Sequence, residues 1–107
     1  MTKTAAPLLL LLLPVLAGAQ GAPAEVTDAQ VSTYQVGLEA GCKQAGRKRG
    51  EVLQKVEDYC NCVIRTLRDN ATREQWQQAY FLFSQGRDRE EMQVLAPYTP
   101  KFQACRG

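Results

Sequence analysis

The chain has 107 residues, of which 45% are hydrophobic, and its 13 basic and 11 acidic side chains give a formal net charge of +2. This near balance argues against a nucleic-acid-binding protein, which normally carries a strong excess of basic residues. Histidine is absent, so the usual general base at neutral pH and the most common nitrogen ligand for zinc are both missing.

Residues 1–19 have the pattern of an export signal peptide. Lys3 is basic, residues 8–16 are apolar, and residues 17–19 are the small residues that signal peptidase recognises. The apolar run is shorter than the roughly 20 residues of a spanning helix. We therefore expect a periplasmic or secreted protein that begins at Gln20 and has no stable membrane anchor, with residues 20–26 as a mobile lead and residues 27–107 as a single helical domain.

The first predicted helix begins after Thr27, which can form a capping box with Gln30. An apolar stripe follows at spacings of three and four residues, formed by Val31, Tyr34, Leu38, Cys42 and Ala45. Gly37 and Gly41 lie beside this stripe, and we expect them to allow another helix to approach closely. Gly46 is predicted to end the helix.

A second helix is predicted over about residues 51–69, antiparallel to the first because the connection is short. Its apolar face consists of Val52, Val56, Tyr59, Cys60, Val63 and Leu67. Cys62 lies about 200° around this helix from Cys60, since each residue advances the helical wheel by about 100°. The two sulfurs should therefore face different neighbours.

The third predicted helix, residues 73–84, follows a second capping box between Thr72 and Gln75. It is the aromatic helix, with Trp76, Tyr80 and Phe83 expected to face the core. Phe81 points about 200° away from Phe83 and should be the more exposed of the two.

A short fourth helix is predicted over residues 88–95, with Asp88 and Glu91 as its capping pair. Pro97 should stop it, and a final turn from Thr99 should end at Cys105. No segment alternates like a strand, so the predicted fold is all-α, a small bundle of about four helices stapled by disulfides.

The four cysteines are Cys42, Cys60, Cys62 and Cys105. A domain of this size has a marginal core, and an even number of cysteines in an exported chain indicates two disulfides. Cys42 and Cys60 both lie on inward stripes, which favours Cys42–Cys60 with Cys62–Cys105. The pairing Cys42–Cys62 with Cys60–Cys105 remains open, because sequence alone does not fix the axial levels of the two helices.

Three segments carry a resemblance to small exported bacterial helical proteins: Gly41-Cys42, Tyr59-Cys60-Asn61-Cys62-Val63 and Phe102-Gln103-Ala104-Cys105. The resemblance covers most of the mature chain. It implies export and a helical disulfide framework, and it implies no activity or functional residue.

No predicted apolar face carries a pair of carboxylates that would suit acid–base catalysis, so we predict that the protein is not an enzyme and has no cofactor. We expect a module that binds a protein partner in the cell envelope, as an inhibitor, an immunity-type protein or an assembly partner. Phe81 and Tyr98 are the candidate interface residues, since aromatic side chains anchor interfaces. The alternative is a periplasmic copper carrier that uses the thiolates of Cys60 and Cys62. The identity of the partner and the oligomeric state stay open.

Overall fold

The computed structural model describes residues 25–106, which contain four α-helices, one 3-10 helix and no strand. The elements are α2 (Asp28–Lys48), α3 (Leu53–Asn70), α4 (Arg73–Ser84), α5 (Asp88–Leu95) and the 3-10 helix η3 (Ala96–Arg106). The prediction of a small all-α fold is confirmed. The predicted signal peptide, residues 1–19, and the first part of the predicted lead, residues 20–24, lie outside the described residues. Val26, at the end of that lead, is buried.

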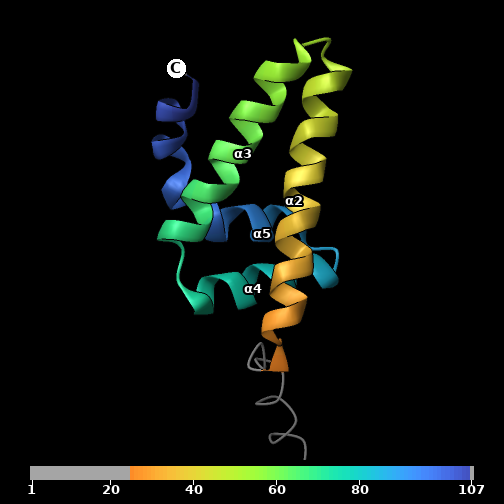
Figure 1. The fold of residues 1–107 in the computed structure, drawn as a ribbon. Helices are drawn as coiled ribbons and strands as arrows, with labels where there is room; N and C mark the ends of the chain where they lie inside the picture. The colour runs from red at the N-terminus through yellow and green to blue at the C-terminus, as the bar shows by residue number, and fades with distance from the viewer. Residues whose placement is uncertain (1–24, 107) are drawn as a thin grey trace, which may run out of the picture.

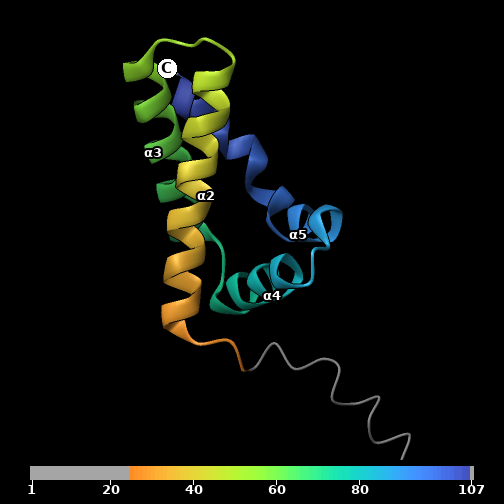
Figure 2. The same cartoon turned by 90° about the vertical axis from the view of Figure 1, so that its right-hand side faces the viewer.

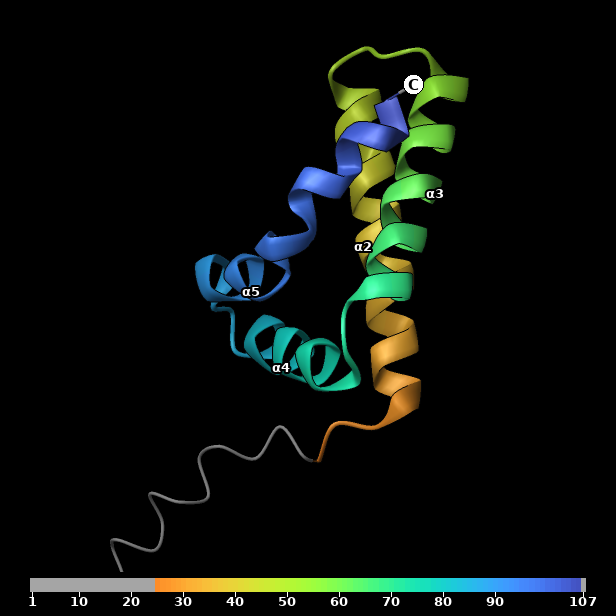
Figure 3. The ribbon, with the colours of Figure 1, turned by 90° about the vertical axis from the view of Figure 1, so that its left-hand side faces the viewer.

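α2 and α3 form a long antiparallel hairpin, and the rest of the chain packs against it (Figure 1). α4 and α5 lie across the hairpin near its open end, and η3 then runs back along α3 toward the turn of the hairpin (Figures 2 and 3). We call α5 and η3 together, residues 88–106, the C-terminal arm.

Both predicted capping boxes are confirmed, and they determine where α2 and α4 begin. The backbone N–H of Gln30 donates to Thr27 Oγ1 at 3.1 Å, and the Thr27 N–H donates to Gln30 Oε1 at 2.9 Å. Thr72 and Gln75 make the same two bonds at 3.0 and 2.9 Å. These bonds satisfy backbone donors that the first turn of a helix leaves unpaired. At α5 the prediction was wrong, because Asp88 lies inside the first turn and Arg87 precedes it without a side-chain cap.

The turn between α2 and α3 depends on two glycines with different roles. Gly50 has a φ of +78°, a left-handed conformation that favours glycine. Gly46 does not end the helix as predicted, because α2 continues to Lys48. Gly46 is buried, and a Cβ at this position would lie 2.8 Å from Val56 Cγ2. α3 therefore packs tightly against α2 at Gly46. Gly37 and Gly41 are exposed, and a Cβ added at either would meet no atom within 4 Å, so the predicted small-residue contact there was wrong.

Replacing Gly41 with alanine is expected to raise the free energy of unfolding by about 0.5–1 kcal/mol, because glycine in a helix interior is less favourable than alanine and the new methyl group meets nothing. Gly46→Ala gains the same helix propensity but must displace Val56, and overpacking costs about 1–3 kcal/mol. Urea unfolding of both variants checks this difference. Equal stabilisation by both changes would contradict the close approach at Gly46.

The central core joins the hairpin to α4, through Tyr34, Ile64, Leu67, Trp76 and Ala79. Trp76 is buried as predicted, but the prediction for the other face of α4 was reversed. Phe83 is 52% exposed, and Phe81 is only partly exposed. The buried face of α4 is formed by Trp76, Ala79 and Leu82, and both Trp76 and Ala79 belong to the core that α4 shares with the hairpin.

Two disulfides staple the fold, and they have the favoured pairing. Cys42 is bonded to Cys60 and Cys62 to Cys105, with Cα–Cα distances of 5.8 and 5.6 Å, and no cysteine is free. The first bond joins the two helices of the hairpin, and the second joins α3 to the far end of the C-terminal arm. Two structural disulfides are typical of a protein that folds in an oxidising compartment.

Candidate functional site

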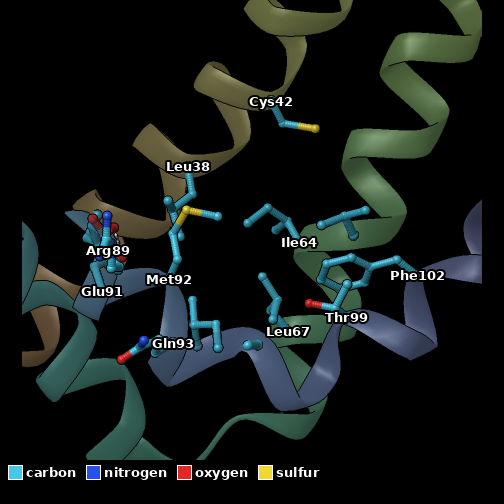
Figure 4. Close-up of a pocket in the computed structure, with 14 residues that line it drawn as sticks. Leu38, Cys42, Ile64, Leu67, Arg89, Glu91, Met92, Gln93, Thr99 and Phe102 are labelled. Atoms are coloured by element: carbon cyan, nitrogen blue, oxygen red, sulfur yellow. Dashed lines mark hydrogen bonds between the residues drawn. The ribbon is translucent and has the colours of Figure 1, made fainter.

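An apolar cavity of about 520 Å³ lies between the hairpin and the C-terminal arm (Figure 4). The hairpin contributes apolar side chains to it, namely Leu38, Val63, Ile64 and Leu67, together with Tyr34 and Cys42. The arm contributes the opposite wall, including Met92, Leu95, Ala96, Thr99 and Phe102. This volume falls within the range of about 300–1,000 Å³ that is typical of small-molecule sites.

The arm forms one wall of the cavity, which stays open to solvent. Neither α5 nor η3 contains a fully buried residue. Leu95, Tyr98 and Phe102 are partly buried and pack against the central core, while Met92 is 71% exposed although it lines the cavity. The bond from Cys62 to Cys105 fixes the end of the arm to α3. The C-terminal arm, which forms one wall of the cavity, is thus held in place by a disulfide and by side chains that are only partly buried.

A polar contact also ties the arm to α2 beside the cavity. The hydroxyl of Tyr34 donates a hydrogen bond to the carboxylate of Glu91 on α5. Burial, and then the hydrogen bond to Glu91, raises the pKa of Tyr34 far above its ordinary value. The phenol of Tyr34 therefore stays protonated at neutral pH and acts as the donor in this pair.

The charged and amide side chains at the cavity belong to α5. Arg89, Glu91 and Gln93 line it, and Figure 4 shows Arg89 and Glu91 on the side away from Phe102. Arg87 makes an ion pair with Glu90, whereas Arg89 takes part in none of the ion pairs found among residues 25–106. Arg89 is exposed. A cation without an anionic partner therefore stands at one side of an otherwise apolar space.

A second cavity of about 610 Å³ lies on the other side of Tyr34 and Leu38, which line both spaces. Its remaining lining comes from α2 and α4 and includes Tyr80 and the exposed Phe83. The walls of this second cavity come from α2 and α4, whereas those of the first cavity come from α2, α3, α5 and η3.

The predicted interface residues do not belong to either cavity. Phe81 is partly buried on α4. Tyr98 is also partly buried, and its hydroxyl donates a hydrogen bond to Gln75 Oε1, the atom that also caps the start of α4. Phe83 has the exposure that was predicted for Phe81.

The two cysteines of the alternative copper site are engaged elsewhere. Cys60 and Cys62 are each bonded to a different cysteine, so neither is a thiolate in this structure. Among residues 25–106, no group of three or more histidine, cysteine, aspartate or glutamate side chains is arranged to hold a metal ion.

Sequence reasoning assigned Leu38, Val63 and Leu67 to helix packing and did not assign Ile64 to the apolar face of α3. No pattern in the sequence indicated the cavity, because its lining residues on α3, with Val56 and Cys60, form an apolar stripe of the width that is usual for a core-facing helix.

Within the part of the chain that the structure describes, no helix combines the length and the apolar character needed to cross a membrane. In comparisons with known proteins, the chain matches no protein-family model, no curated protein and no solved structure.

Proposed function

We propose that this protein is a non-enzymatic binding module of the periplasm or the extracellular space, and that the cavity between the hairpin and the C-terminal arm is its binding site. The observation that carries the proposal is the cavity itself, an apolar space of about 520 Å³ with walls from four elements. An apolar group that enters it is removed from water, which contributes about 25 cal/mol for each Å² of apolar surface buried.

The chemistry of the lining supports binding rather than catalysis. The cavity walls are mainly hydrocarbon, and the phenol of Tyr34 is held as a hydrogen-bond donor to Glu91. A catalytic acid or base works best with a pKa near the working pH. Burial and the bond to Glu91 move the pKa of Tyr34 the opposite way, further from neutral pH.

The export pattern of residues 1–19, the resemblance to exported helical proteins and the two disulfides support the compartment. A copper carrier would require reduction of both disulfides to free Cys60 and Cys62, and no contact in the structure favours that state.

Filling the cavity from its exposed wall tests the proposal. Ala96 lines the cavity and is itself exposed, so Ala96→Trp places an indole in the cavity without removing a core side chain. We expect the neutral fluorescent probe N-phenyl-naphthylamine to bind the native protein, and to bind Ala96→Trp at least about tenfold more weakly, which corresponds to about 1.4 kcal/mol. Fluorescence titration measures both affinities.

Ala40→Trp is the matched control, because Ala40 is exposed on α2 and lines neither cavity. It should bind the probe like the native protein, and both variants should melt at similar temperatures. The proposal fails if the native protein does not bind the probe, or if the two tryptophan variants bind it equally.

A further inference from the structure

We infer that the ligand of this cavity is a single-chain amphiphile with an anionic headgroup, a fatty carboxylate, whose alkyl chain lies in the cavity and whose headgroup meets Arg89. This inference rests on the proposed function and adds the class of ligand to it. Three features support it: the volume of the cavity, its lining and the charge at its edge.

The volume suits a small ligand such as an alkyl chain. The cavity holds about 520 Å³, within the range of about 300–1,000 Å³ that is typical of small-molecule sites. A single alkyl chain can lie along the walls formed by α3 and the arm.

The lining favours hydrocarbon over a polar ligand body. Among residues 25–106, no polar or charged residue is buried. A polar ring or a peptide group placed against Val63, Ile64 and Leu67 would lose part of its hydration, and these three side chains offer no hydrogen bond in return, which is costly. The part of the ligand that lies within these walls must therefore be apolar.

The charge at the edge favours an anion as the polar end of the ligand. Of the two charged residues that line the cavity, Glu91 accepts a hydrogen bond from Tyr34, whereas Arg89 has no ion-pair partner among the described residues. A guanidinium binds a carboxylate through two parallel hydrogen bonds. The bond from the neutral phenol of Tyr34 leaves Glu91 charged but engages its carboxylate, so the group at this edge that can pair with a headgroup is the guanidinium of Arg89.

Three probes with the same alkyl chain separate these features: decanoate, decanol and decyltrimethylammonium. Met92 lines the cavity, and Met1 is the only other methionine in the sequence. Protein labelled with ¹³C at its methionine methyl groups therefore reports binding at Met92, with Met92→Leu to assign the resonance. Each probe is titrated below its critical micelle concentration, and isothermal calorimetry gives the affinity.

We expect decanoate to shift the Met92 resonance. Decanoate should bind about fivefold more tightly than decanol, because one exposed ion pair contributes about that much to the affinity. Decyltrimethylammonium should bind most weakly of the three probes. Arg89→Gln should make decanoate and decanol equal. Arg65→Gln, which removes an exposed arginine of α3 that lines neither cavity, should keep the difference.

Equal binding of the three probes to the native protein, with no effect of Arg89→Gln, would overturn the anionic ligand and leave the apolar binding site intact. The titration of Ala96→Trp with the neutral probe tests that site separately. A dimer in sedimentation equilibrium that Ala96→Trp abolishes would place a second copy of the chain in the cavity and overturn the inference.

Discussion

Reduction of both disulfides is expected to remove most of the stability of this domain. The Cys42–Cys60 bond joins residues 18 apart and the Cys62–Cys105 bond joins residues 43 apart. Closing loops of these lengths in the unfolded chain contributes about 3 and about 4 kcal/mol in the chain-entropy description. Small domains have a total stability of only about 5–15 kcal/mol. Urea unfolding followed by far-UV circular dichroism, with and without reductant, measures the loss.

Two double variants separate the contributions of the two bonds. Cys62→Ser with Cys105→Ser frees the end of the C-terminal arm, whose helices contain no fully buried residue. This variant should lose probe binding while the hairpin stays helical. Cys42→Ser with Cys60→Ser should lose stability but keep the arm attached and retain more probe binding. A melting temperature that does not change on reduction would show that packing alone holds the helices together.

Trp76→Ala is expected to lower the free energy of unfolding by about 3–5 kcal/mol, the usual cost of removing a large buried aromatic side chain. Trp76 is only 4% exposed and belongs to the central core. Its ring meets that of Tyr34 edge to face at a centroid distance of 6.2 Å, so the substitution also removes an aromatic contact. Chemical denaturation of the native protein and the variant gives the difference.

Phe83→Ala, on the same helix, serves as the control variant for Trp76→Ala. Phe83 is half exposed, and its ring contacts those of Tyr34 and Tyr80 at centroid distances of 5.2 and 6.4 Å. Losing these contacts should cost about 1 kcal/mol. If Phe83→Ala were as damaging as Trp76→Ala, the orientation of α4 described above would be wrong.

The parts of the fold that depend on neighbouring residues could be predicted from the sequence. Thr27 with Gln30, and Thr72 with Gln75, contain the whole capping interaction within four residues, so the starts of α2 and α4 were correct. The favoured disulfide pairing is confirmed as well. The angle of about 200° between Cys60 and Cys62 is a property of any regular helix and argued against a bond between them, but the choice between the two remaining pairings depended on the axial levels of the helices.

What could not be predicted depends on how separate elements meet. The helical wheel gives the angle between Phe81 and Phe83 but does not say which side of α4 turns toward the hairpin. In the structure the buried side is the one that carries Trp76, Ala79 and Leu82. The cavity was missed for the same reason, since its two walls come from segments whose distance is fixed only when the arm folds back onto α3.

The positions of Cys60 and Cys62 on α3 have a consequence for the cavity that we propose as the binding site. Their bonds leave the helix in nearly opposite directions, one toward α2 and the other toward η3. With both in place, α3 can neither turn about its own axis nor slide along α2, the two motions by which packed helices commonly close a void between them. Val63, Ile64 and Leu67 must therefore keep facing the cavity before any ligand arrives. A ligand then meets walls that are already in position, and less of its binding free energy is spent on ordering the protein.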